Sequence, residues 1–229
     1  YAHTAKELID KLRPYAAINK FPLVQEYCPG KGIGQMFLVQ EGEILLQFQH
    51  QRVNEWPPEG GVSTLCKSLP LSTHQACRER SETLLRNMRW TGVAMVEYRY
   101  DHDTDTYYFM EINGRFWGSL PLAIAAGVPF AAGLVQSAKK GAVQPEQPEY
   151  ANLHCRFMIP EIRRMGRLLF QSNQIQDPYY HYSRLSEFSS FVFNFFRPGT
   201  RYYLFSMSDP GPFLADLKNI MAKALFRKG

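Results

Sequence analysis

The chain has 229 residues, of which 45% are hydrophobic and 14% aromatic, and its formal net charge is +5. This composition excludes an intrinsically disordered chain, because it provides enough apolar surface for one large domain or two small lobes that share a core. The charge does not identify a partner, since a basic chain suits nucleic acid, anionic lipids and anionic metabolites equally well. The most apolar run, Phe188 to Phe196, is shorter than the roughly 20 residues that span a bilayer. No signal peptide is visible, so we expect a cytoplasmic protein without stable membrane insertion.

The N-terminal third begins with a helix signal and continues with strand signals. Thr4 and Glu7 form a capping-box pattern, which predicts a short amphipathic helix. Strands are then expected at Leu23 to Cys28, Gln35 to Gln40 and Glu43 to Gln49. Because Glu41 and Gly42 are typical of a tight turn, the last two strands should form a hairpin that starts an antiparallel sheet.

A glycine-rich segment lies between the first two of these strands. Gly30, Gly32 and Gly34 resemble the glycines of a phosphate-binding loop, but no helix follows whose N-terminus could hold a phosphate. We therefore predict a tight turn there. Lys31 could contact a nucleotide, although a solvated loop lysine is the better interpretation.

A helix and a hairpin are expected next. Ser72 or Thr73 can cap a helix that runs to about Arg89 and packs on the hairpin. Its predicted apolar stripe consists of Ala76, Leu84 and Met88. The hairpin strands are Val93 to Tyr100 and Tyr107 to Ile112.

The polar residues between the two hairpin strands predict a turn. Asp101, Asp103 and Asp105 imitate the start of an EF-hand loop, but Thr106 occupies the position of its glycine and Ile112 that of its bidentate glutamate. We therefore interpret the three aspartates as turn residues.

The hairpin carries the most informative polar residues of the chain. If its turn centres on Thr104, Glu97 lies directly opposite Glu111, and these like charges repel unless a positive charge lies between them. Alternate strand positions share a face, so Glu111, Asn113 and Arg115 should point the same way. Oxygen ligands from Glu97, Glu111 and Asn113 suit Mg²⁺, and Arg115 could contact the same phosphate or a substrate carboxylate. Solvated strand ends remain the alternative for either carboxylate taken alone.

The C-terminal half is less informative. Two short helices should follow Gly118, the first ending near Gly127 and the second running from Pro129 to before Gly141. Pro145 to Tyr150 marks a predicted boundary between a domain of residues 1–144 and an extension of residues 145–229. In that extension we expect the aromatic run of residues 188–196 to be a buried strand or helix.

Two further patterns in the extension concern its helices. Its arginines could form a basic patch, but a solvated helix face is the preferred interpretation for Arg156, Arg163, Arg164 and Arg167. Ser208 or Asp209 should open a final helix with Pro212 in its first turn. The spacing predicts that its apolar stripe packs in the core: Phe213, Leu217, Ile220, Met221 and Ala224. The four cysteines match neither a zinc ribbon nor a small disulfide framework, so reduced thiols are expected.

Three segments occur in the order found in one enzyme superfamily. Glu97 with MEINGRFWGS at Met110 to Ser119 resembles the metal-binding end of the ATP-grasp carboxylate-amine ligases. PLVQEYCPG at Pro22 to Gly30 resembles the strand that joins the two ATP-grasp lobes, where adenine binds. FQHQRVNEWPPEGGVS at Phe48 to Ser63 resembles the phosphate and acceptor region, including a biotin carboxylase segment. The chain also resembles ligases related to D-aspartate ligase and to carbamoyl phosphate synthetase.

The resemblance implies an α+β fold, namely the C-terminal lobe of an ATP-grasp domain with an antiparallel sheet and flanking helices, followed by an α-rich C-terminal extension. In that family an N-terminal lobe and a glycine-rich lid with a nucleotide-binding lysine come first. Because neither precedes Tyr1, we expect the chain to be the C-terminal portion of a longer enzyme and to be inactive alone.

The resemblance also implies the roles of individual residues. ATP is the implied cofactor, with Mg²⁺ or alternatively Mn²⁺. The metal ligands are Glu97, Glu111 and Asn113, and the catalytic residues are Arg52 and Arg115. The nucleotide-binding residues are Gln25, Glu26, Tyr27, Cys28 and His50, with the Glu26 carbonyl and the Cys28 amide facing adenine. Gly61 and Ser63 would bind substrate.

The implied reaction is transfer of the ATP γ-phosphoryl group to a carboxylate, followed by attack of an amine on the acyl phosphate to form a C–N bond. The partners are then a small-molecule carboxylate and an amine, with no nucleic acid. An ATP-grasp kinase acting on a hydroxyl and a noncatalytic nucleotide-binding module remain alternatives. A homodimer also stays open, because periodicity does not separate an exposed helix face from a dimer patch.

Overall fold

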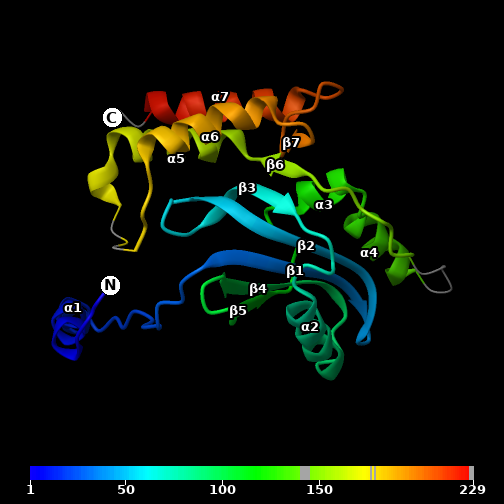
Figure 1. The fold of residues 1–229 in the computed structure, drawn as a ribbon, viewed down its shortest axis with the longest axis horizontal. Coiled ribbons are helices and arrows are strands. Elements are labelled where there is room, and N and C mark those ends of the chain that lie inside the picture. Colours follow the sequence, from blue (N-terminus) through cyan, green and yellow to red (C-terminus); the bar gives the residue numbers. More distant parts are fainter. Residues whose placement is uncertain (140–144, 176, 178, 227–229) are drawn as a thin grey trace.

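Seven strands form a single sheet within the residues that the computed structural model describes, which are 1–139, 145–175, 177 and 179–226. Their order across the sheet is β5-β4-β1-β2-β3-β6-β7, and every neighbouring pair is antiparallel except β6 and β7. The strands are β1 (Lys31–Gln40), β2 (Glu43–Trp56), β3 (Val62–Ser68), β4 (Gly92–Asp101), β5 (Thr106–Asn113), β6 (His154–Arg156) and β7 (Thr200–Tyr202). The predicted α+β fold with a largely antiparallel sheet is confirmed (Figure 1).

The helices cover the sheet unevenly, with α2 against one face, α3 and α4 against the other, and α5 to α7 beside β6 and β7 (Figure 1). They are α1 (Ala5–Ala17), α2 (Gln75–Asn87), α3 (Leu120–Ala126), α4 (Phe130–Ala138), α5 (Met158–Phe170), α6 (Arg184–Phe196) and α7 (Gly211–Phe226), with a 3₁₀ turn at Ser172–Gln174. Within the described part of the chain no single helix has the length and apolar character to cross a bilayer. The pair α3 and α4, bent by 90°, meets those criteria only when taken together.

Strand β1 is buried on both faces and divides the core into two clusters. Phe37 and its alternate neighbours on the strand pack with Leu85 of α2. Met36 and Leu38 point the other way and pack with Leu122 of α3 and Phe130 of α4. Because successive strand residues face opposite sides, a nearly continuous apolar run on one strand supplies both clusters.

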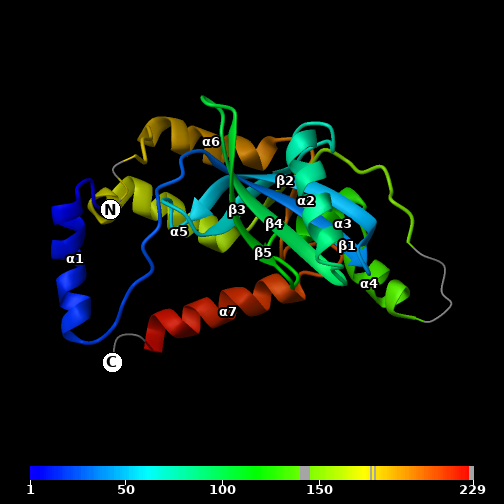
Figure 2. The same ribbon diagram turned by 90° about the horizontal axis from the view of Figure 1, so that it is seen from below.

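Helix α1 forms as predicted but stands apart from the sheet, as Figures 1 and 2 show. The Glu7 amide donates to Thr4 Oγ1 at 3.1 Å, which confirms the helix cap. The strand expected at Leu23 to Cys28 is wrong, since this segment is irregular and Leu23 and Val24 are exposed. Both hydrogen-bonding sides of the adjoining β1 are already occupied by β2 and β4, so the segment has no vacant strand edge to join there.

The predicted turns are confirmed by their backbone geometry. Glu41 and Gly42 both have positive φ, at 50° and 88°, as the tight turn between β1 and β2 requires. In the β4–β5 turn the Asp103 amide donates to Asp101 Oδ1 at 3.0 Å, so this aspartate serves the turn. Helix α3 ends at Gly127, where φ is 106°, and α4 begins directly after Pro129. Helix α4 ends at Ala138, which confirms the predicted end before Gly141.

Helix α2 packs on the hairpin as predicted, but with a different face and a different start. His74 precedes its first turn without a side-chain cap, and the predicted caps Ser72 and Thr73 are wrong. The buried residues are Cys77, Ser81 and Leu85, whereas the stripe predicted from Ala76, Leu84 and Met88 is wrong. The helix is oriented so that Ser81 lies on its buried face, where the Ser81 hydroxyl is 2.9 Å from the Tyr98 hydroxyl.

The C-terminal part of the chain contradicts two expectations, one about its aromatic run and one about its arginines. The run of residues 188–196 lies in α6 with Phe193 and Phe196 exposed, so its predicted burial is wrong. Arg156 and Arg164 are buried rather than solvated, and the guanidinium of Arg156 lies 4.4 Å from the centre of the Phe195 ring.

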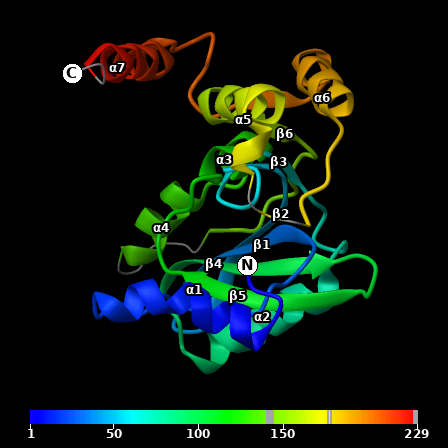
Figure 3. The ribbon, with the colours of Figure 1, turned by 90° about the vertical axis from the view of Figure 1, so that its left-hand side faces the viewer.

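Helix α7 extends away from the sheet (Figure 3). Leu217 on this helix is exposed, which contradicts the predicted core stripe at that position. The side chains of Ile220, Met221 and Ala224 lie outside the described residues.

The position of α2 generates a stability prediction. Leu85 is 0% exposed and Met88 is 50% exposed, although the two residues are one turn apart. Leu85→Ala should lower the free energy of unfolding by about 2–5 kcal/mol, because it opens a cavity in the core. Met88→Ala should change it by less than about 0.5 kcal/mol. Urea unfolding of both variants measures this, and a larger loss for Met88→Ala would contradict the observed helix orientation.

Candidate active site

The two hairpin carboxylates meet at a single amide. Glu97 on β4 pairs directly with Glu111 on β5, as predicted, but the turn does not centre on Thr104: Asp101 pairs with Thr106, and a register shift between Glu97 and Tyr98 brings the two glutamates opposite each other. Asn113, two residues after Glu111 on the same face, donates from Nδ2 to Glu97 Oε1 at 2.7 Å and to Glu111 Oε1 at 2.8 Å. Both carboxylate oxygens therefore converge on one point occupied by a hydrogen-bond donor, the place where a cation would otherwise relieve their repulsion.

Arg52 supplies positive charge to this pair from two strands away. Its guanidinium forms an ion pair with Glu97 and a second one with Glu55 at 3.2 Å, and it donates to the Gly61 carbonyl at 3.3 Å. The side chain has to cross β1 to reach Glu97, since β1 lies between β2 and β4. Gly32 leaves the space: a Cβ there would lie 2.7 Å from Arg52 Cδ.

Gly34 likewise leaves space on β1 for the side chain of His50. A Cβ at Gly34 would lie 2.7 Å from His50 Nε2. The predicted turn at Gly32 and Gly34 is therefore wrong, because both are strand residues that make room for side chains of β2. Only Gly30, with a φ of 99°, has turn geometry. Alternate strand positions do aim His50 and Arg52 to one face, as the sequence predicts.

Burial controls the protonation of the site. Burial lowers the pKa of His50 to about 3, and the nearby Arg52 charge acts in the same direction, so the imidazole is neutral at pH 7. Burial raises the pKa of Glu97, and Glu111 raises it further, while Arg52 opposes both. Burial lowers the pKa of Arg52, but Glu97 and Glu55 more than offset this effect, and Arg52 stays a cation.

A cavity of about 400 Å³ brings most of the predicted site residues together. Eight of them line it: His50, Arg52, Gly61, Ser63, Glu97, Glu111, Asn113 and Arg115. The guanidinium of Arg115 donates to the Phe116 carbonyl at 3.2 Å, and no ion pair with either hairpin carboxylate is found among the described residues. The sequence reasoning missed seven other lining residues, which are Val62, Met95, Trp117, Gly118, Ser119, Phe157 and Tyr203. The first five lie beside predicted residues on the same strand or motif, but no sequence signal points to the last two.

The arrangement suits a hard divalent cation. No group of three or more His, Cys, Asp and Glu side chains that could hold a metal is found in the described part of the chain. Two carboxylates and one amide are the available ligands. Rotating the Asn113 amide by half a turn would bring its oxygen to the point where Glu97 and Glu111 converge. Mg²⁺ is commonly held by one or two carboxylates and fills its remaining positions with water or phosphate oxygens.

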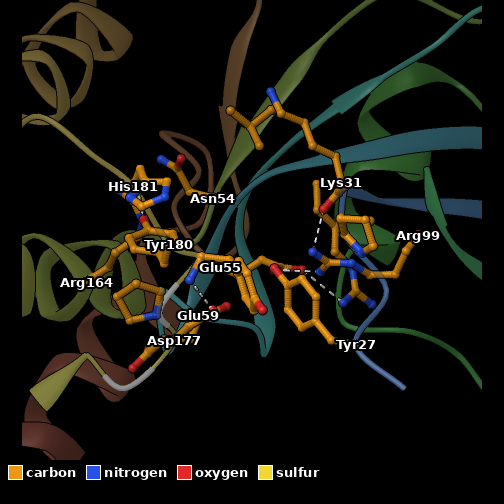
Figure 4. A pocket seen from close by; sticks show the side chains of 17 residues that line it. Tyr27, Lys31, Asn54, Glu55, Glu59, Arg99, Arg164, Asp177, Tyr180 and His181 are labelled. Atoms are coloured by element: carbon orange, nitrogen blue, oxygen red, sulfur yellow. Dashed lines mark hydrogen bonds and ion pairs between the residues drawn. The ribbon is translucent and has the colours of Figure 1, made fainter. Parts of the chain in front are cut away.

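A second cavity of about 350 Å³ adjoins the first through Arg52, which lines both. Figure 4 shows its walls, with Tyr27, Lys31 and Arg99 on one side and Arg164 and Tyr180 of the C-terminal part on the other. Tyr27 is the only residue of the predicted nucleotide segment among its described lining residues. Gln25 and Glu26 are exposed and Cys28 is half-buried in the segment before β1, and their roles stay predictions.

Sequence comparisons relate the chain to ATP-dependent enzymes. The profile of a family described as "ATP-grasp in the biosynthetic pathway with Ter operon" matches residues 22–158, more than half of the chain. Urea amidolyase of Saccharomyces cerevisiae is 30% identical over 93 residues, which are 41% of this chain and 5% of that protein. Acetyl-CoA carboxylase 2 of Arabidopsis thaliana is 29% identical over 82 residues, 36% of this chain and 3% of that protein. The chain thus spans a small part of the length of these relatives.

A solved structure shares the fold. The biotin carboxylase domain of a thermophilic 2-oxoglutarate carboxylase, bound to bicarbonate, aligns with a TM-score of 0.50 and 15% identity. The alignment covers 66% of this chain and 37% of that one. At this identity the likeness supports the architecture of the sheet and its flanking helices.

The crossing of β1 by Arg52 generates a prediction that a double-mutant cycle can check. Gly32→Ala should lower the free energy of unfolding by about 1–3 kcal/mol, because the new methyl group displaces Arg52 from Glu97. In an Arg52→Ala background the same substitution should cost much less, since the clash is gone. Gly166→Ala is the control, because no heavy atom lies within 4 Å of its Cβ position. Equal costs of Gly32→Ala in both backgrounds would show that Arg52 is not the obstacle.

Proposed function

We propose that this chain, which belongs to the family described as "ATP-grasp in the biosynthetic pathway with Ter operon", is part of a ligase. The ligase activates a carboxylate with ATP and joins it to an amine. One observation carries the proposal. Glu97 and Glu111 face each other, share one amide, and lie in a cavity that also holds Arg52 and Arg115. A carboxylate pair beside two arginines in one cavity is suited to a metal–phosphate complex.

The metal of this site would be Mg²⁺, held by Glu97, Glu111 and Asn113. When bound, it would supply positive charge to the phosphate oxygens of the nucleotide. The raised pKa of Glu97 supports this assignment, because a buried carboxylate beside a second one is stabilised by an added positive charge.

Arg52 and Arg115 would act on the transferred phosphoryl group. A substrate carboxylate oxygen attacks the γ-phosphorus, the bond to the β-phosphate oxygen breaks, and ADP and an acyl phosphate result. An amine then attacks the acyl carbon, inorganic phosphate leaves, and the amine loses a proton as the C–N bond forms. The arginines position the anions and offset their charge in both steps, so no nucleophilic side chain is required.

The nucleotide base and ribose would lie in the cavity of Figure 4, beside Tyr27. This placement is supported by the position of Arg52 between the two cavities, which would leave the phosphates next to Glu97 and Glu111. Neutral His50 would contribute a hydrogen bond from or to Nε2 rather than a charge. Gly61 and Ser63, on the rim of the carboxylate cavity, would contact the carboxylate substrate.

A kinase acting on a hydroxyl would use the same carboxylates and arginines. The two reactions differ in their products, since only the ligase forms an amide, and only when an amine is present. The bicarbonate in the related carboxylase structure is itself a carboxylate-type anion, which favours the ligase.

Calorimetric titration of the chain with ADP, with and without Mg²⁺, tests the proposal. Glu111→Ala should reduce Mg²⁺-dependent ADP binding by roughly tenfold or more, because one of two charged ligands is lost. Cooperative thermal unfolding of the variant should be retained, since Glu111 is exposed at the sheet edge.

The matched control is Glu146→Ala, which removes an exposed carboxylate from the connection before β6. Its Mg²⁺-dependent binding should equal that of the unmodified chain. If Glu111→Ala bound MgADP as tightly as this control, the metal assignment would be wrong.

A further inference from the structure

Two buried polar atoms of the carboxylate cavity have no hydrogen-bond partner within the described part of the chain. They are Nε1 of Trp117, which is 3% exposed, and Nε2 of His50, which is 1% exposed. An indole N–H can only donate, and leaving it buried and unsatisfied is costly. Both residues line the cavity, so a ligand that brings an acceptor would relieve this cost.

The remaining bonds of these two residues hold them in place. His50 Nδ1 lies 3.0 Å from Ser119 Oγ, which leaves only Nε2 for a ligand. The Trp117 ring packs edge-on against Phe130 of α4, with ring centres 5.1 Å apart. Neither ring is therefore free to turn its nitrogen to another partner without repacking.

The cavity also has an aromatic wall that comes from the C-terminal part of the chain. Phe157, just before α5, and Tyr203, just after β7, stack with ring centres 5.3 Å apart and planes 15° apart. The Tyr203 hydroxyl lies 2.9 Å from Cys66 Sγ, and the Tyr203 amide donates to the Arg156 carbonyl at 2.9 Å. These contacts hold the ring pair at the cavity. Phosphoryl transfer requires charge and positioning there, which an apolar ring surface does not supply.

We propose that the carboxylate substrate of this site carries a flat apolar group, an aromatic ring or its equivalent. Its carboxylate accepts a hydrogen bond from Trp117 Nε1, and its ring packs against Phe157 and Tyr203. This inference rests on the proposed ligase function and adds to it the class of the acid. A carboxylate without such a group would leave the aromatic wall without a complementary surface.

Phenylacetate and acetate serve as probes, because they share the carboxylate and differ in the ring. Calorimetric titration of the chain, with and without MgADP, should show phenylacetate binding about tenfold more tightly than acetate. Phe157→Leu should abolish most of this preference, whereas Phe157→Tyr, which keeps a flat ring, should retain it. Trp117→Phe removes only the N–H and should weaken both acids about tenfold without changing their ratio.

Phe196→Leu is the matched control, because this ring is exposed on α6 and does not line the cavity. It should leave the preference for phenylacetate unchanged, and a thermal unfolding transition confirms that each variant is folded. Equal affinities for the two acids, or a preference that survives Phe157→Leu, would overturn the inference while leaving MgADP binding intact. Selective phenylacetate binding without any MgADP binding would instead keep the aromatic-acid site and reject the ligase function.

Discussion

The ion pair between Arg52 and Glu97 is the interaction on which the site depends. Glu97 and Glu111 are neighbours across a ladder, and Glu97 is partly withdrawn from water, an arrangement that is unfavourable without positive charge. Arg52 supplies that charge only because Gly32 carries no side chain, so a guanidinium from β2 can lie over β1 and reach β4. A glycine on a central strand usually weakens it, and here the same absence of a side chain creates the site.

The C-terminal part of the chain contributes to the site through the sheet itself. Strand β6 pairs with β3, and β7 adds in parallel to β6, so residues distant in sequence are carried to the edge of the cavity. Phe157 and Tyr203 reach the carboxylate cavity in this way, and Arg164 reaches the neighbouring cavity from α5 (Figure 4). Glu161, buried on α5, accepts a hydrogen bond from Asn54 of β2 at 2.7 Å and so ties the helix to the sheet. The proposed boundary at residues 145–150 therefore separates two segments that contribute to common cavities.

Several expectations failed where a local pattern was ambiguous between two environments. The apolar spacing in α2 fitted more than one face, and the Ser81 hydroxyl could not be expected on the buried face before Tyr98 was known to lie opposite it. Arginines 156 and 164 look like a solvated patch in sequence, yet one lies against aromatic rings and the other pairs with Glu187 at 2.9 Å. Burial of a charged residue depends on partners that are remote in the chain, so periodicity alone does not reveal it.

By itself the sequence determined the two hairpin strands and the shared face of Glu111 and Asn113, because strand alternation is a local property, whereas the register shift that sets Glu97 opposite Glu111 was seen only in the structure. The motif order also identified His50 and Arg52 on β2, Glu97 on β4, and Glu111 and Asn113 on β5, which line the carboxylate cavity. Only the tertiary structure decided that Gly32 and Gly34 make room for Arg52 and His50, since this depends on which strands are neighbours. It alone also brought in Phe157, Tyr203 and Arg164, because contacts between distant segments are set by the packing of the whole sheet.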